Sequence, residues 1–228
     1  MNHDPVIVAL DFDSAEEADQ LVSALGSSAG FYKVGMELFA AAGMDYVRRL
    51  VGSGKQVFLD MKYYDIGETV RRAVAVAAKS GATFLSVHAV GQVMKAAVEG
   101  RGDSPMKLLA ITVLTSLDQQ DVNDMGHECT VSELVARRVR QAMQCGIEGV
   151  VASPLEARTI REVAGPTAIL VTPGVRSAGS ARGDQKRVAT PAQAIRDGAS
   201  HLVIGRQVTR AADPVAALAA IRAEIATS

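Results

Sequence analysis

The chain has 228 residues, 48% of them apolar, and its 24 basic and 25 acidic side chains leave a formal net charge of −1 at pH 7. This balance argues against a protein that coats nucleic acid or an acidic membrane, and the absence of Trp argues against a base-stacking surface. The polar start, Met1–Asp4, is unlike a secretory signal, and no apolar run is long enough to span a bilayer. Cys129 and Cys145 have neither metal-site nor disulfide-framework spacing. We expect a cytoplasmic protein without nucleic-acid or membrane partners.

Apolar runs typical of strands alternate with amphipathic helical runs along the whole chain. Eight strands are predicted, over Val6–Phe12, Phe31–Met36, Gln56–Lys62, Phe84–His88, Lys107–Leu114, Gly149–Ala152, Ile169–Thr172 and His201–Ile204. Most are continuous apolar runs, as expected for strands that are covered on both faces.

A helix is predicted after each strand. The ranges are Ala15–Leu25, Ala40–Val51, Glu68–Lys79, Gln92–Glu99, Val131–Gln144, Leu155–Val163, Pro191–Asp197 and Pro214–Ala226. Asp13 or Ser14 can cap the first helix, and Thr190 and Asp213 each precede a Pro that suits the first helical position. Eight βα units predict one closed (β/α)₈ barrel domain over residues 1–228, with an open doubly wound sheet as the alternative.

Charged residues gather at the ends of the predicted strands, where such barrels keep their active sites. They are Asp11, Lys33, Asp60, Lys62 and, just beyond the third strand, Asp65. Asp60 and Lys62 are two positions apart, so they share a face of their strand. Singly, Asp11 can cap a helix, Lys33 can extend to solvent, and Asp60 with Lys62 can form a structural ion pair. Five charges on one rim are costly unless they are used, so together they predict a functional site.

Other polar residues follow the later strands. His88, Thr115 and Ser116 come after strands four and five, and a wall or capping role is the structural explanation for each. Loops after strands seven and eight commonly bind phosphate in this fold. Arg176, Gln185, Gly205 and Arg206 are the candidates, because arginine forks suit phosphate oxygens and glycine permits close backbone approach. We expect the irregular segment 176–187 to be a mobile loop that closes over the ligand.

These residues resemble the orotidine 5′-phosphate decarboxylase family over essentially the whole chain. The motifs that carry the resemblance are Ala9–Asp11, Phe31–Phe39, Phe58–Lys62, Asp65-Ile66, Val87–Ala89, Leu114–Ser116, Thr172–Arg176, Gly183–Gln185 and Ile204–Arg206. The chain departs from the usual family pattern at Tyr64, Gly67, Glu68, Val90 and Gln92, which affects one wall of the site and leaves its charges unchanged.

The resemblance implies decarboxylation of orotidine 5′-monophosphate to uridine 5′-monophosphate, the last step of de novo uridylate synthesis, with no metal and no cofactor. It implies that Lys62 is the proton donor in an array of Lys33, Asp60, Lys62 and Asp65, the last from the neighbouring subunit of a homodimer. Asp60 would lie near the departing carboxylate. By the same resemblance, the ribose would be bound by Asp11 and Lys33, with Asp65 and Thr69, and the pyrimidine would be contacted by Thr115. The phosphate would be bound by Arg176, Gln185, Gly205 and Arg206. Ile66 and Pro173 complete the implied substrate-binding set.

Two alternatives remain at this stage. One is a metal-dependent sugar-phosphate aldolase or decarboxylase of the same superfamily, which Gly67 slightly favours. Such an enzyme needs a carboxylate on strand two to hold magnesium, and Lys33 occupies the inward position there. The other is a non-catalytic nucleotide-binding barrel, which is expected to have lost part of the charge cluster.

Overall fold

The computed structural model describes residues 4–177 and 187–227, and their strands form a closed barrel. Eight parallel strands follow one another around it in chain order, and β1 pairs with β8 to close it. Their bounds are β1 Val6–Leu10, β2 Phe31–Gly35, β3 Gln56–Tyr63, β4 Phe84–His88, β5 Lys107–Ile111, β6 Gly149–Val151, β7 Ile169–Thr172 and β8 His201–Ile204. This confirms the single (β/α)₈ barrel, and the open sheet is wrong.

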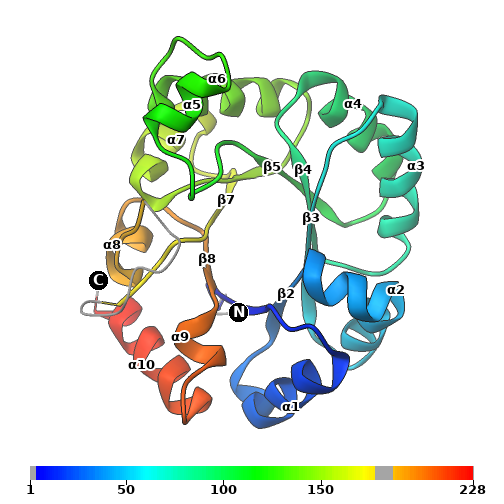
Figure 1. Cartoon of the computed structure of the whole chain (residues 1–228), viewed down its shortest axis with the longest axis vertical. Coiled ribbons are helices and arrows are strands. Elements are labelled where there is room, and N and C mark those ends of the chain that lie inside the picture. The colour runs from blue at the N-terminus through cyan, green and yellow to red at the C-terminus, as the bar shows by residue number, and fades with distance from the viewer. Residues whose placement is uncertain (1–3, 178–186, 228) are drawn as a thin grey trace.

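Helices form a ring around the barrel (Figure 1). They are α1 Ala15–Leu25, α2 Met36–Gly52, α3 Gly67–Ala78, α4 Gly91–Arg101, α5 Gln119–Asp124, α6 Val131–Gln144, α7 Ala157–Ala164, α8 Pro191–Arg196, α9 Arg206–Thr209 and α10 Pro214–Ala226, with 3₁₀ turns at Gly26–Ser28 and Pro154–Glu156. The side chains of Ser14, Thr190 and Asp213 cap α1, α8 and α10, as their sequence positions predict.

The structure corrects several predicted boundaries. β1 ends at Leu10 and β5 at Ile111, so the residues that follow belong to loops at the barrel rim. α2 begins at Met36 and continues across a kink at Gly43, where φ is 64°. α5 and α9 were not predicted, because helices of six and four residues are too short to show a helical period.

Two apolar layers hold the barrel together. Leu59, Leu85 and Val87 belong to the layer between strands and helices, whereas Phe58 and Phe84 fill the barrel interior with a ring-centroid distance of 6.1 Å. The alternation of strand side chains therefore leaves an apolar plug inside the barrel and brings the next inward residues of the same strands to its carboxyl rim.

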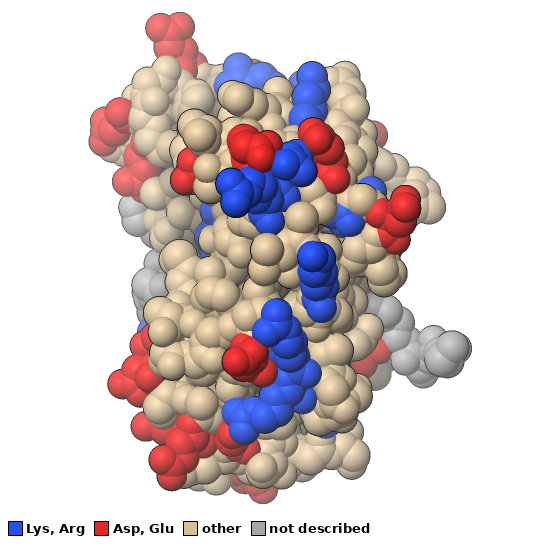
Figure 2. Space-filling view, turned by 90° about the vertical axis from the view of Figure 1, so that its right-hand side faces the viewer, with Lys and Arg blue, Asp and Glu red and all other residues tan. Residues whose placement is uncertain are grey.

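The outer surface mixes both signs of charge. Figure 2 shows the side of the barrel on the right of Figure 1, where basic and acidic side chains lie beside one another. Ion pairs such as Arg71 with Glu68 on α3 and Arg49 with Asp19 contribute to this pattern, which is typical of solvated helix faces. Within residues 4–177 and 187–227, no helix has the length and apolar character needed to cross a membrane.

Candidate active site

Four charged side chains from three neighbouring strands form a continuous array at the carboxyl rim. The Lys33 ammonium on β2 lies 2.7 Å from Asp11 Oδ1, just after β1, and 3.9 Å from Asp60 Oδ2 on β3. Lys62 Nζ donates to the same Asp60 Oδ2 at 2.8 Å. The order Asp11, Lys33, Asp60, Lys62 alternates in sign, so each internal charge is flanked by opposite charges.

A glycine at the end of β2 leaves space beside the Lys33 ammonium. Gly35 ends this strand, and a Cβ atom built there would lie only 2.8 Å from Lys33 Nζ. Glycine therefore leaves the room through which the Lys33 side chain reaches Asp11. Gly35 carries no signal of this role in the sequence, because a glycine at a strand end does not show which side chain lies beside it.

Asp60 is the most deeply buried carboxylate of the array, with 8% of the residue exposed. Burial by itself raises the pKa of a carboxyl group, but the charges of Lys33 and Lys62 and the hydrogen bonds from Lys62 and Ser86 outweigh it. The pKa of Asp60 is therefore held below its ordinary value, and Asp60 is ionised at neutral pH. An ionised Asp60 attracts and orients the side chains of Lys33 and Lys62 on either side of it.

Ser86, on β4, is a site residue that sequence analysis missed. Its hydroxyl donates to Asp60 Oδ1 at 2.8 Å and accepts from the Lys62 backbone N–H at 2.9 Å. A single serine in an apolar strand carries no functional signal in a sequence, because many serines in strands only satisfy backbone groups. Its role depends on the register of β3 against β4.

The array opens into an inner cavity of about 210 Å³. Asp60 and Lys62 form its charged wall, Thr115 and Ser116 its polar wall, and Val113 and Pro173 part of its apolar wall. A cavity with charged, polar and apolar walls suits a small ligand that has both apolar surface and polar edges. The structure thus brings together Asp60, Lys62, Thr115 and Pro173 from the predicted set.

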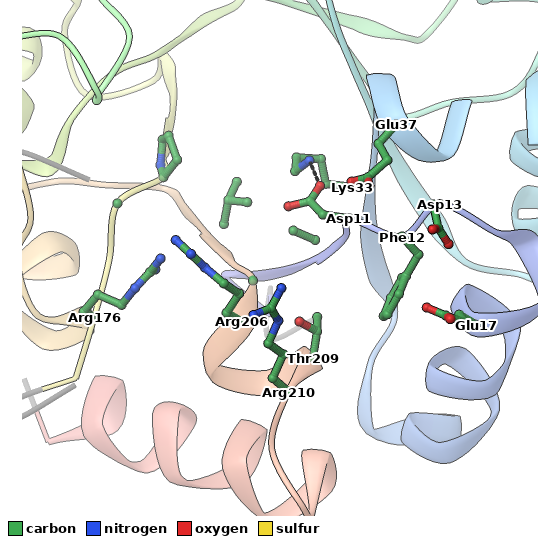
Figure 3. Close-up of a pocket in the computed structure, with 15 residues that line it drawn as sticks. Asp11, Phe12, Asp13, Glu17, Lys33, Glu37, Arg176, Arg206, Thr209 and Arg210 are labelled. Atoms are coloured by element: carbon green, nitrogen blue, oxygen red, sulfur yellow. Dashed lines mark hydrogen bonds and ion pairs between the residues drawn. The ribbon is translucent and has the colours of Figure 1, made fainter. Parts of the chain in front are cut away.

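A larger outer cavity of about 810 Å³ adjoins the inner one and shares Pro173 with it. Arg176, Gly205 and Arg206 line one side, and Asp11 and Lys33 line the other. Figure 3 shows the Arg176 and Arg206 side chains, from the segment after β7 and from α9, extending into the cavity that Asp11 borders. Thr209 and Arg210 of the same α9 region also line it and were not predicted.

Asp65, Ile66 and Thr69 lie on the exposed rim beyond β3. Asp65 Oδ1 accepts the Ile66 N–H at 2.6 Å, and within the described chain no ion pair joins Asp65 to Lys62. A single chain therefore supplies Asp11, Lys33, Asp60 and Lys62 to the array, and its own Asp65 does not join them. Gln185 and most of the 176–187 loop lie outside the described residues.

His88 borders the site without adding charge to it. Its ring lies 5.5 Å from that of the exposed Tyr64. Burial, together with the positive charges of Arg138 and Lys62, lowers the pKa of His88. The imidazole is therefore neutral at neutral pH, in keeping with a wall residue.

The fold and the site define a (β/α)₈-barrel enzyme with a lysine–carboxylate centre beside an arginine-lined cavity. The family model "Orotidine 5′-phosphate decarboxylase / HUMPS family" matches residues 4–221. The chain belongs to this family.

Individual proteins named orotidine 5′-phosphate decarboxylase are similar over nearly their whole length. That of Rhodopseudomonas palustris (strain BisB5) is 53% identical over 225 residues, covering 99% of this chain and 96% of the relative. That of Nitrobacter winogradskyi is 52% identical over 221 residues, covering 97% and 92%. The crystal structure of the Lactobacillus acidophilus protein of this name superposes with a TM-score of 0.85 at 39% identity, covering 98% of this chain and 99% of that one.

Proposed function

We propose that this chain decarboxylates orotidine 5′-monophosphate to uridine 5′-monophosphate, in pyrimidine biosynthesis, and that Lys62 carries the chemical step. The observation that supports these roles is the Lys62 ammonium held 2.8 Å from the buried, ionised Asp60 at the wall of the inner cavity. The family and the relatives described above support the same reaction.

The reaction needs a fixed positive charge. The bond between the ring carbon and the carboxylate breaks, carbon dioxide leaves, and the electron pair stays on the ring carbon, where no conjugated group can accept it. Lys62 stabilises this pair electrostatically and then donates a proton to the carbon. Because Asp60 and Lys33 hold the array in place before the reaction, little reorganisation is needed as charge develops.

The remaining roles follow from the two cavities. Asp11 and Lys33, paired at 2.7 Å, bind the ribose hydroxyls. Thr115 contacts the pyrimidine edge in the inner cavity and Pro173 packs at its junction with the outer one. Arg176, Gly205 and Arg206 bind the phosphate in the outer cavity. The family resemblance adds Gln185, which lies outside the described residues, to this phosphate-binding set.

The proposal predicts that activity does not depend on a divalent metal. Lys33 places an ammonium between two carboxylates, at the position where a magnesium-dependent relative needs an oxygen ligand, and this positive charge repels a divalent cation. We expect the loss of orotidylate ultraviolet absorbance to proceed at an unchanged rate, within about 20%, in excess chelator.

Two results of this assay would contradict the proposal. A rate that collapses with chelator and returns with magnesium would indicate the metal-dependent class. No absorbance change at any enzyme concentration, with tight binding of uridine 5′-monophosphate, would indicate a nucleotide-binding barrel without catalysis.

We also propose a homodimer whose subunits share their active sites. The segments that directly follow four consecutive strands, β2 to β5, each expose a large apolar side chain at the carboxyl rim: Met36, Tyr64 with Ile66, Val90 and Leu114. Tyr64 and Ile66 are 67% and 69% exposed and flank Asp65. Exposed apolar side chains that recur along one rim favour an interface, and a two-fold contact there would bring Asp65, Ile66 and Thr69 to the partner's site.

Shared sites predict complementation between inactive variants. Lys62→Ala and Asp65→Asn should each be nearly inactive, and their mixture should regain about a quarter of wild-type activity, because half of randomly exchanged dimers are hybrids with one intact site. The measurement is the decarboxylase rate after subunit exchange verified by native mass spectrometry.

The control is a mixture of Lys62→Ala with the Lys62→Ala/Asp65→Asn double variant, which contains no intact site in any dimer. Hybrids that form and yet stay inactive would contradict a shared site.

The two free thiols, Cys129 and Cys145, suit a reducing compartment, and a cytoplasmic location is part of this proposal.

A further inference from the structure

Ser86 is a fully buried polar residue in the centre of β4. Leu85 and Val87, on either side of it, pack in the layer between strands and helices, so Ser86 faces the barrel interior with Phe84. A buried hydroxyl is costly unless it is hydrogen-bonded. The Ser86 hydroxyl is hydrogen-bonded to the lysine–carboxylate centre, to the Asp60 carboxylate and to the Lys62 backbone N–H.

Lys62 has a backbone conformation that needs support. Its φ of 51° lies in the left-handed region, and among the described residues it is the only non-glycine with a positive φ. The β3–β4 register also shifts between Leu59 and Tyr63, so the regular ladder is interrupted here. The Lys62 N–H is instead bonded to Ser86 Oγ at 2.9 Å. Ser86 thus satisfies a donor that the irregularity removes from the ladder.

The contacts form a closed ring of hydrogen bonds. The Lys62 main chain donates to Ser86, the Ser86 hydroxyl donates to Asp60 Oδ1 at 2.8 Å, and Asp60 Oδ2 accepts from the Lys62 ammonium at 2.8 Å. The ring fixes the two ends of the lysine relative to one another, and it leaves each Asp60 oxygen with its own donor. A flexible side chain with several rotatable bonds is thereby held in one arrangement.

We propose that Ser86 is a positioning residue, which holds Lys62 in its left-handed conformation and orients Asp60 so that the ammonium is aimed at the reacting carbon. The inference rests on the roles of Lys62 and Asp60 proposed above. Ser86 need not touch the substrate, and its effect passes through the two charged residues.

Loss of this hydroxyl should affect turnover far more than binding. Without it the Lys62 N–H loses its acceptor and Asp60 Oδ1 its donor, so the lysine backbone can relax toward an ordinary φ and carry the ammonium with it. Misplacement of a catalytic group by about 1 Å costs about 10²-fold in rate. The phosphate and ribose contacts assigned to Arg206, Asp11 and Lys33 come from other segments, namely α9, the residue after β1, and β2, and they remain.

The experiment compares Ser86→Ala with Ser80→Ala. Ser80 is also buried, and it precedes β4 at the end of the strand away from the site. Its hydroxyl donates to the Ala77 carbonyl and accepts the Ala82 N–H, so, like Ser86, it accepts a backbone N–H while donating to another group. We expect Ser86→Ala to lower kcat by about 30- to 100-fold with the Kd of uridine 5′-monophosphate within threefold of wild type. Ser80→Ala should keep kcat within twofold of wild type, even if its Tm falls as much as that of Ser86→Ala.

Ser86→Thr keeps the hydroxyl and should recover at least a third of wild-type kcat. The inference is overturned if Ser86→Ala keeps kcat within twofold of wild type, if Ser80→Ala loses as much, or if nucleotide affinity falls in proportion to kcat. A wild-type protein inactive on orotidylate would instead defeat the proposed function, so the two failures are distinguishable.

Discussion

Replacing Lys62 by Ala should lower kcat by about 10⁵-fold. A positioned general acid contributes about 10²–10⁴-fold, and a charge aimed at the developing carbanion contributes about 10²–10³-fold more. Lys62 is the only residue of the array for which we propose both effects. The measurement is single-turnover decarboxylation with enzyme in excess, which separates the chemical step from product release.

The variant should still fold and bind nucleotide. Asp60 keeps the hydrogen bond from Ser86 and the ammonium of Lys33 at 3.9 Å, so its charge does not lose all its partners. We expect the Kd of uridine 5′-monophosphate to stay within about tenfold of wild type, because its phosphate contacts lie in the outer cavity. Lys107→Ala is the matched control, since this exposed lysine begins β5 at the opposite end of the barrel. Single-turnover decarboxylation by Lys62→Ala at a near wild-type rate would eliminate Lys62 as the proton donor.

Replacing Arg206 by Ala should lower kcat/KM by about 100-fold. A charge-assisted hydrogen bond contributes about 1.5–3 kcal/mol, and a bidentate arginine–phosphate pair lies at the upper end of this range. Because the phosphate site is remote from the bond that breaks, its binding energy can be used to close the site and exclude water. The loss should therefore appear in kcat as well as in KM.

The same role can be tested with the substrate in two pieces. Orotidine, which lacks the phosphate, should be a poor substrate, and added phosphite dianion should raise its turnover by wild-type enzyme by at least about tenfold. Arg206→Ala should show a much smaller activation. Arg140→Ala, an exposed arginine on α6, serves as the control. An absence of activation in the wild type, or an undiminished kcat/KM in Arg206→Ala, would remove the phosphate role.

The charged part of the site was predictable because it interrupts a strong pattern. Asp60, Lys62 and Lys33 stand in otherwise apolar strands, and charged residues in such runs are rare unless they are paired or used. The resemblance to a family then supplied the order and roles of these residues. The helix caps are equally predictable from the sequence, because Ser14, Thr190 and Asp213 accept hydrogen bonds from backbone N–H groups only three residues away.

Other site features depend on contacts between distant segments. Gly35 leaves space beside the Lys33 ammonium where it pairs with Asp11, and no local pattern shows this. The α9 turn is too short to have a helical period, yet it brings Arg206 and Arg210 to the outer cavity. For Asp65 and Thr69 the family resemblance implies a place in a partner's site, and the structure adds that both are exposed beside apolar side chains on the same rim.

The residue pattern alone specifies a barrel with charges on its carboxyl rim. Apolar strand runs and helix amphipathicity are local properties, and they recur in all eight βα units. The closed ring of Lys62, Ser86 and Asp60 is a different kind of feature. It joins residues 24 and 26 positions apart, through a register shift between two strands and one positive φ. Only the packing of β3 against β4 decides it, since the register of two paired strands sets which side chain meets which backbone group.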